Sequence, residues 1–335
     1  MRFLLGAILI AAAAWAGYWF VGAGAARMAF EGWFEARRAD GWQAEYRELD
    51  IAGFPNRFDA GFDAIALADP DTGLAWEAPY FQVLALSYRP NHVIAVWPRE
   101  QLFATPLGKY RVESGDMRAS LVLDPGTTLR LDRATLTAEA LVVTPQGDDT
   151  PFSAEALTLA AEQVPADNAA SYRLGLAAEG LTPSLDWQRK VDPDGTLPDS
   201  LGAVRADLQI TFDKPWDRFA IEEARPQPRL IRLKLAEATW GQLALQAAGE
   251  VQVDGAGQPT GTITVKAKNW REILQLARNS GRLGPGMADT VEDGLGMIAR
   301  LSGNPDTLDI PLDFAEGRIW LGPVPLGPAP VLRLR

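Results

Sequence analysis

The sequence predicts a mainly β protein with an N-terminal transmembrane helix. A long curved antiparallel sheet, or two sheets, is expected to follow, covered in part by two C-terminal helices. Three observations lead to this fold class. A charge-free apolar stretch opens the chain, short alternating runs recur between turn residues from Trp42 to about Lys268, and apolar residues at helical spacing follow Asn269.

The first predicted element is the apolar segment from Phe3 to Ala26, which has 24 residues and no charged side chain. This length is enough for a helix to cross a hydrocarbon core of roughly 30 Å. Aromatic residues crowd its second half, where amphipathic rings favour the membrane interface. Because Arg2 precedes it, we expect a single-pass anchor with a cytoplasmic N-terminus. The alternative is a signal peptide cleaved after Ala25, since Ala23-Gly24-Ala25 has the small-residue pattern of such sites.

After the anchor (residues 1–26) the sequence predicts a juxtamembrane helix over residues 27–41 and a β-rich domain over residues 42–335. This domain is expected to be single or to have two lobes with a boundary near 180–200. Its first strands are separated by Gly53-Phe54-Pro55, because glycine permits a bend and proline fixes it. In the second of these strands, alternate residues are predicted to share one face: Phe58, Ala60, Phe62 and Ala64.

Several predicted strands are apolar on both faces, such as "VLALSY", "HVIAVW" and "EALVVT". An antiparallel sheet with one wet face should alternate more cleanly. The middle of the sheet is therefore expected to be covered on both faces, by helices, a second sheet or a ligand. Helices predicted over residues 269–281, with Asn269 as N-cap, and after Gly284-Pro285 can cover one face. A hairpin is expected to close the chain.

Composition excludes several classes of chemistry. The net charge of −11 disfavours nucleic acid as a partner, because an acidic surface repels phosphates. The chain has no cysteine and one histidine, His92, in a predicted loop, so a zinc site would need mostly carboxylates. Asp148-Asp149 and Asp192-Pro193-Asp194-Gly195 are interpreted as turns rather than calcium loops. We therefore expect no cofactor, no metal and no catalytic residue.

Acidic and tryptophan residues remain as candidates. A carboxylate-based hydrolase is suggested by residue type alone, at Asp213, Asp217 and Glu222-Glu223, although most of 43 acidic residues belong on the surface. Tryptophan is in excess, with 11 residues, most of them expected in the core. The candidates for an apolar groove or a partner surface are Trp76, Trp97, Trp216, Trp240 and Trp270.

The ordered motifs "GFPNRFD" (53–59), "YRPNHVIAVWP" (88–98), "TFDKPW" (211–216) and "GRIWLGPVPLGPAP" near the C-terminus resemble a proteobacterial family. It is known only as domain of unknown function number twenty-one twenty-five. The resemblance implies an inner-membrane-anchored protein with its bulk in the periplasm, and it supplies no catalytic residues. The run "ATWGQLALQAAGEVQVDGAGQPTGTITV" (238–265) resembles, more distantly, repeats of AsmA-like envelope proteins, which implies a long sheet with an apolar trough.

These features lead to one functional hypothesis and two alternatives. The first is a membrane-anchored periplasmic protein that binds or passes an apolar ligand in a groove formed by the sheet and the C-terminal helices, for envelope homeostasis. Lipid is the ligand class that we expect. The second is a non-catalytic envelope scaffold or assembly factor that contacts another protein. The third is a carboxylate-based hydrolase of envelope polymers, which requires two acidic residues within roughly 5–10 Å in a cleft.

Overall fold

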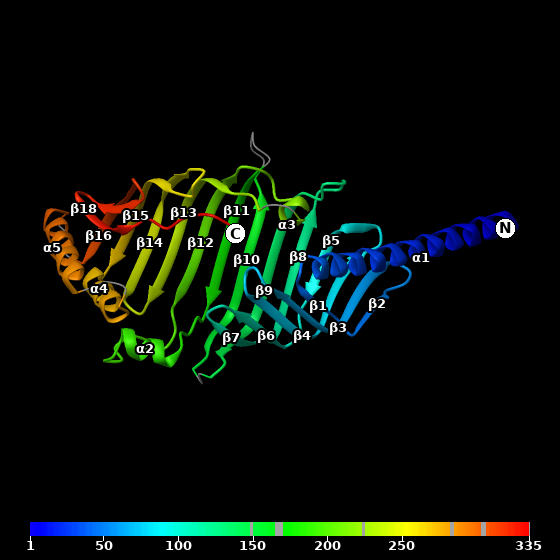
Figure 1. Ribbon diagram of the computed structural model, residues 1–335, viewed down its shortest axis with the longest axis horizontal. Coiled ribbons are helices and arrows are strands. Elements are labelled where there is room, and N and C mark those ends of the chain that lie inside the picture. Colours follow the sequence, from blue (N-terminus) through cyan, green and yellow to red (C-terminus); the bar gives the residue numbers. More distant parts are fainter. Residues whose placement is uncertain (148–149, 165–169, 223–224, 282–284, 303–305, 335) are drawn as a thin grey trace. The chain divides into compact units, whose positions relative to one another are not determined.

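The computed structural model describes residues 1–147, 150–164, 170–222, 225–281, 285–302 and 306–334. It confirms the predicted class, because the chain is mainly β, with a long antiparallel sheet, one long N-terminal helix and C-terminal helices (Figure 1). Contacts divide the chain into two compact units, Met1–Pro125 with Leu136–Asp149 and Gly126–Thr135 with Thr150–Arg335. This division lies earlier than residues 180–200, and the two lobes expected there remain a prediction.

The first unit combines helix α1 (Arg2–Ala39) with short and medium antiparallel strands. Strand β3 pairs with β1, β2 and β4, while β4 also pairs with β5 and β6. The outer pairs are β5 with β8, β6 with β7, and β7 with β9. The strand bounds are β1 Gln43–Glu45, β2 Glu48–Ala52, β3 Arg57–Asp69, β4 Leu74–Leu86, β5 Arg89–Val96, β6 Glu100–Thr105, β7 Gly108–Glu113, β8 Asp116–Leu123 and β9 Leu131–Pro145. The start of β9, up to Thr135, belongs to the second unit.

Helix α1 packs against the first unit in addition to having the length and composition of a membrane span. It is long and apolar enough to cross a membrane. From Trp15 onward it also packs on the first unit: the Trp19 indole donates a hydrogen bond to the Arg57 carbonyl at 2.6 Å, and the Phe30 ring lies 5.2 Å from Phe62. The N-terminal part of α1 extends beyond the strands of this unit (Figure 1), and the Trp15 indole donates a hydrogen bond to the Pro55 carbonyl. The helix therefore covers one face of the first sheet region.

The core of the first unit is an aromatic cluster under α1. Phe34, Phe62 and Ile65 are at most 4% exposed. From Phe62 the ring contacts continue to Phe81 at 6.3 Å between centroids. Such tilted and edge-on ring pairs add to the free energy gained by burying apolar area.

The predicted alternation along β3 is correct up to Phe62 and wrong at Ala64. Ala60 and Phe62 are each 3% exposed, but the next buried side chain is Ile65, at 4%. Ala64 has φ 49°, in the left-handed region, and lies between residues paired with Tyr80 and Ala78 of β4. This local twist turns Ala64 outward and gives its inward place to Ile65.

The second unit is an antiparallel meander in which each strand from β10 to β18 pairs with the next. Its strands are β10 Phe152–Gln163, β11 Ser171–Glu179, β12 Ala203–Phe212, β13 Pro228–Trp240, β14 Leu243–Val253, β15 Pro259–Lys268, β16 Thr307–Ala315, β17 Arg318–Leu321 and β18 Val324–Pro328. Its helices are α2 Leu185–Val191, α3 Phe219–Glu222, α4 Trp270–Asn279 and α5 Pro285–Ser302.

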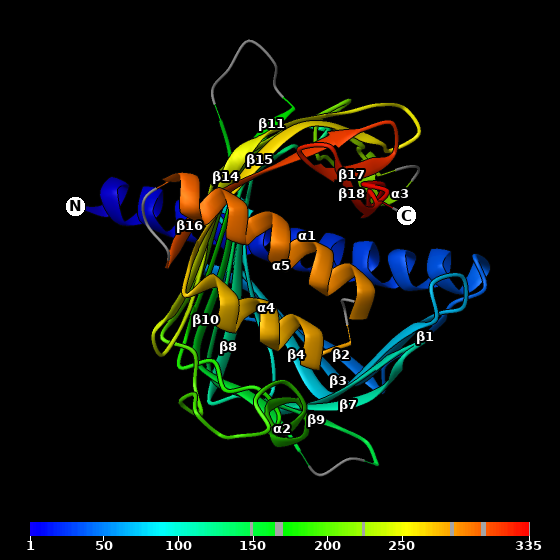
Figure 2. The ribbon, with the colours of Figure 1, turned by 90° about the vertical axis from the view of Figure 1, so that its left-hand side faces the viewer.

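In the chain, helices α4 and α5 connect β15 to β16, two strands that pair with each other. The two helices lie side by side (Figure 2). They bury Trp270, Leu274 and Leu295 against Leu308 of β16, which forms the main core of this unit. Asn269 is the N-cap residue of α4, as predicted, but its side chain makes no capping hydrogen bond. Asn269 takes a left-handed conformation, with φ 57°, and its side-chain amide donates to the Gln242 carbonyl at 2.9 Å.

A candidate apolar ligand site

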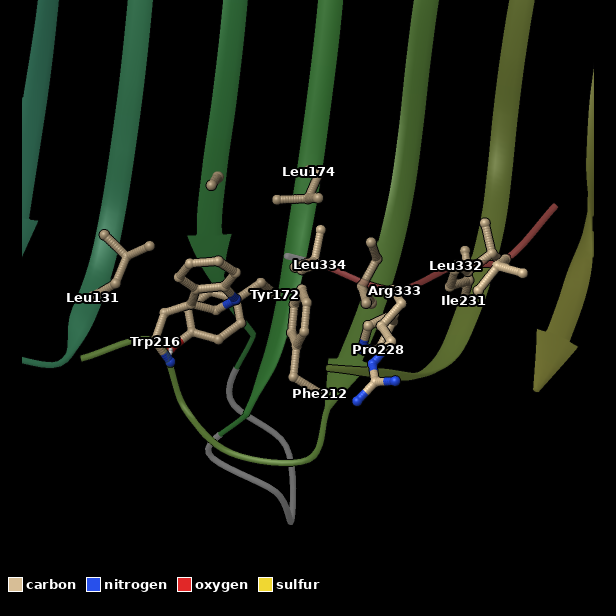
Figure 3. Close-up of a pocket in the computed structure, with 13 residues that line it drawn as sticks. Leu131, Tyr172, Leu174, Phe212, Trp216, Pro228, Ile231, Leu332, Arg333 and Leu334 are labelled. Atoms are coloured by element: carbon tan, nitrogen blue, oxygen red, sulfur yellow. Dashed lines mark hydrogen bonds between the residues drawn. The ribbon is translucent and has the colours of Figure 1, made fainter. Parts of the chain in front are cut away.

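The second unit contains a cavity of about 630 Å³ above the strands β10 to β13 (Figure 3). This volume lies within the range of known small-molecule sites. Among the described residues, its walls are apolar except for one charged side chain. The residues that line it are Leu131, Ala161, Tyr172, Leu174, Ile210, Phe212, Trp216, Pro228, Ile231, Val331, Leu332, Arg333 and Leu334.

Strand register explains why the floor of this cavity is apolar. Tyr172 of β11 pairs with Ile210 of β12, which pairs with Ile231 of β13, so the three side chains form a row across the sheet. Leu174 and Phe212 stand two residues further along β11 and β12, and alternate residues share a face. Two strands with a period-2 apolar pattern therefore supply most of the floor.

Hydrogen bonds hold one wall of the cavity in place. The Trp216 backbone N–H donates to the Tyr172 hydroxyl at 3.1 Å, and the Leu131 N–H donates to the Trp216 carbonyl at 2.7 Å. The Phe212 ring lies edge-on to Trp216, with centroids 5.6 Å apart. Tyr172 is only 1% exposed, so its hydroxyl accepts the Trp216 N–H and is not accessible to a ligand.

The C-terminal segment, residues 329–334, crosses the strands and forms the other wall (Figures 1 and 3). The Leu332 N–H donates to the Gly257 carbonyl at 2.8 Å, while the Leu334 N–H and carbonyl bond the Gln227 side chain at 3.0 and 2.9 Å. Gly257 has φ 84°, and a Cβ there would stand 2.9 Å from Val331. Glycine thus permits the close approach of this segment.

Arg333 is the one charged residue among those that line the cavity. It is exposed, and Figure 3 shows its guanidinium beside Pro228, away from Leu131 and Trp216. Within the described ranges, its guanidinium has no hydrogen bond or ion pair. A carboxylate or phosphate at this end of the cavity would supply the acceptor that guanidinium groups bind in a fork.

The opposite face of the same strands is polar. Arg173 of β11 donates to both carboxylate oxygens of Asp207 on β12, at 2.9 and 2.7 Å. These hydrogen bonds lower the pKa of Asp207. Because Arg173 alternates with Tyr172 and Leu174, the sheet has an apolar face toward the cavity and a charged face away from it. Here the alternation is cleaner than the two-faced pattern predicted for the middle of the chain.

The five candidate tryptophans do not form one site. Trp216 lines the cavity, and Trp270 is buried under α4 and α5. Trp240 stacks on Trp187 at 5.6 Å, and its indole donates to the Pro198 carbonyl at 2.6 Å. Trp76 and Trp97 both contact Phe81 in the first unit, at 5.3 and 5.2 Å.

The helices α4 and α5 do not line the cavity in the part of the chain that the structure describes. The cavity is instead closed by the C-terminal segment, which the sequence analysis left unassigned. One signal was available: Val331, Leu332 and Leu334 are apolar beside Arg333, a pattern suited to one buried and one wet side. This pattern does not predict which strands the segment crosses.

The acidic candidates have structural partners. The Asp213 carboxylate accepts the Gln227 N–H at 2.8 Å, and Asp217 accepts the N–H groups of Phe219 and Ala220. The carboxylate of Asp192 accepts the Leu197 N–H at 2.8 Å, which lowers its pKa and fits the predicted turn. Asp148-Asp149 and Glu223 lie outside the described residues, and the side chain of Glu222 is not described.

The predicted loop position of His92 is wrong. It lies within β5, and its Nε2 is 2.9 Å from the Ser120 hydroxyl on β8. Among the described residues, no group of three or more His, Asp or Glu side chains is placed to hold a metal ion. The described cavity is therefore suited to bind an apolar group, and the guanidinium of Arg333 lies at its edge.

Fold and site together define a β protein with an N-terminal helix that can span a membrane and an apolar cavity in its second unit. Residues 19–330 match a family described as an uncharacterized protein conserved in bacteria (DUF2125), and the chain belongs to this family. Neither a curated protein nor a solved structure matches the chain. The more distant resemblance to AsmA-like proteins remains a prediction.

Proposed function

We propose that α1 anchors this protein in the inner membrane, with a cytoplasmic N-terminus and a periplasmic β-rich part, and that the second unit binds the acyl chain of an anionic lipid. The observation that carries the proposal is the apolar cavity of about 630 Å³ between the sheet and the C-terminal segment. By binding or passing such a lipid, the protein would take part in the lipid homeostasis of the envelope.

The cavity lining supports an acyl chain better than a polar metabolite. Its one buried hydroxyl, on Tyr172, is already an acceptor for the Trp216 N–H. A polar ligand would lose water without finding new partners, which costs free energy. An alkyl chain gains about 0.8 kcal/mol for each buried CH₂ group. The cavity thus favours ligands with an alkyl chain, and Arg333 favours those with a negatively charged headgroup.

The same cavity supports this proposal over the two alternatives. A scaffold with its core filled by its own side chains predicts no cavity of this size. A hydrolase predicts an acidic residue in a cleft with a raised pKa, because a general acid must hold its proton at neutral pH. None of the described residues that line the cavity is acidic, and the resolved carboxyl pKa shifts in the described part of the chain, at Asp192 and Asp207, are downward.

Binding of a fluorescent fatty acid to the full chain in lipid nanodiscs tests the proposal. Ala161→Trp places an indole in the cavity, and Leu159→Trp places the same group two residues away on β10, at a position that is 39% exposed and outside the cavity. We expect Ala161→Trp to weaken binding at least tenfold and Leu159→Trp to leave it unchanged. Equal affinities for the two variants, or no saturable binding by the unaltered chain, would contradict the proposal.

A further inference from the structure

The free part of α1 is shorter than a membrane span. The Trp15 indole donates to the Pro55 carbonyl at 3.0 Å, so packing against the first unit begins at this residue. The 12 residues from Phe3 to Ala14 extend about 18 Å as a helix. A bilayer core of about 30 Å takes about 20 residues. A spanning α1 must therefore immerse about eight further residues, Trp15–Gly22, which are packed on the first unit.

Two turns of the first unit lie against that packed stretch. One, residues 53–56, joins β2 to β3, and the other, residues 87–88, joins β4 to β5. The Tyr18 hydroxyl donates to the Ser87 carbonyl at 2.6 Å, and the Ser87 N–H donates to the Asn56 carbonyl at 2.9 Å. We call these two turns, with Leu86 at the end of β4, the aromatic end of the unit.

Several backbone groups of the aromatic end have hydrogen-bond partners within the protein and so do not need water. Side chains of α1 donate to the carbonyls of Pro55, Arg57 and Ser87. The N–H groups of Asn56 and Arg57 both bond the Gly53 carbonyl, at 3.2 and 2.8 Å. Lipid offers no partner to a free carbonyl or N–H, so only a backbone with internal partners tolerates immersion.

Three of the four exposed side chains of the aromatic end are apolar or amphipathic, those of Phe54, Leu86 and Tyr88, and the fourth is the polar side chain of Asn56. Phe54 is 54% exposed and Tyr88 is 59% exposed, although large rings are usually buried. The Phe54 ring stacks on Phe20 of α1 at 5.7 Å, and Phe20 is itself 65% exposed. Aromatic rings are enriched at the level of lipid headgroups, where one end is apolar and the other wet. The patch is continuous with the apolar surface of α1.

From this length and this surface we propose that the aromatic end of the first unit is inserted into the bilayer that α1 spans, through the headgroup layer and into the adjoining acyl region. The inference rests on the membrane anchor of the proposed function and is independent of the ligand cavity. In this arrangement α1 is a rigid arm rather than a flexible tether. The unit stands on the membrane with β3 and β4 running away from it.

Single-cysteine variants of the full chain test this placement, because the chain has no cysteine of its own. Phe54→Cys and Tyr88→Cys carry an environment-sensitive fluorophore at the aromatic end, and Ile8→Cys carries it in the free helix. The matched control is Leu107→Cys, which is 93% exposed in the turn beyond β6, where Ala104 pairs with Ala75 at the far end of β4. That turn lies about 40 Å from the aromatic end, the length of a 13-residue strand.

The variants are placed in vesicles of phosphatidylcholine and phosphatidylglycerol, with quenchers on the lipid headgroup or in water. We expect fluorophores at positions 54 and 88 to be quenched by the lipid-borne group at least threefold more than at 107, and to be shielded from aqueous iodide. If position 8 is in lipid while 54 and 88 behave like 107, the inference is wrong and the anchor survives. If position 8 is aqueous, the anchor and the inference are both wrong.

Discussion

The backbone N–H of Trp216 donates a hydrogen bond to the hydroxyl of Tyr172 at 3.1 Å, across 44 positions of sequence. Tyr172 belongs to the floor of the cavity and Trp216 to its wall. The Phe212 ring contacts both, at 6.0 and 5.6 Å between centroids. This contact fixes the angle between floor and wall, and so the width of the cavity.

Removal of the Tyr172 hydroxyl is predicted to destabilise the second unit. Tyr172→Phe leaves the Trp216 N–H without this acceptor, and an unsatisfied buried donor costs about 1–3 kcal/mol. Tyr80→Phe removes a hydroxyl from a ring that is 43% exposed and should change the free energy of unfolding by less than about 0.5 kcal/mol. Urea unfolding of the two variants measures the difference, and equal midpoints would contradict the assigned role of the hydroxyl.

Arg333 is predicted to select the headgroup of the ligand. Arg333→Gln should reduce the preference for a fatty acid over the corresponding alcohol by about tenfold, because a charge-assisted hydrogen bond contributes about 1.5–3 kcal/mol. Arg333→Lys should restore part of it, and Arg318→Gln, an exposed arginine outside the cavity, controls for net charge. Competition with a lysophospholipid separates carboxylate from phosphate. An unchanged preference in Arg333→Gln would remove Arg333 from the site.

Glycines 22 and 24 give a matched test of how α1 packs. A Cβ at Gly22 would clash with the Phe58 ring, whereas a Cβ at Gly24 meets nothing within 4 Å. Gly24→Ala should stabilise the protein by up to about 1 kcal/mol through helix propensity. Gly22→Ala should lose that gain, because the Phe58 ring must move. Thermal unfolding in one detergent compares them, and equal stabilisation would show that α1 is not packed on β3.

Acid is predicted to weaken the charged face of the second sheet region. The pKa of Asp207 is lowered in the folded state by its hydrogen bonds to Arg173, so its contribution is present at neutral pH and lost as the pH falls through the lowered value. Asp207→Asn should therefore lose less stability than the unaltered chain between pH 7 and pH 3. The difference should be small because the pair is exposed. Identical pH profiles would contradict this linkage.

Local pattern and long-range contact were predictable to different degrees. The two strands around Gly53-Phe54-Pro55 and the helices after Asn269 follow from period and punctuation in the sequence. The left-handed Ala64 could not be predicted, because its conformation is set by pairing with β4 and not by its own preference. The conformation of Asn269 could not be predicted either: it is the N-cap residue, but its side-chain amide donates to the carbonyl of Gln242, a contact that the local sequence does not indicate.

The place of the cavity could not be predicted from the sequence. Apolar strands without catalytic groups led us to expect an apolar ligand, which stays a prediction, and Trp216 was among the candidate residues. The wall formed by Leu332 and Leu334 depends on contacts with Gly257 and Gln227, far away in sequence. The packing of Trp19 on β3 was missed because an apolar segment of that length fits a membrane helix by composition alone.

The most direct test of the central claim is photocrosslinking of a diazirine-bearing fatty acid to the full chain in nanodiscs, with mass spectrometry of the labelled peptides. The account predicts label on peptides that contain Tyr172, Trp216 and the 331–334 segment, reduced by Ala161→Trp and unaffected by Leu159→Trp. Label confined to α1, with none on the cavity peptides, would contradict the claim that the second unit holds an acyl chain.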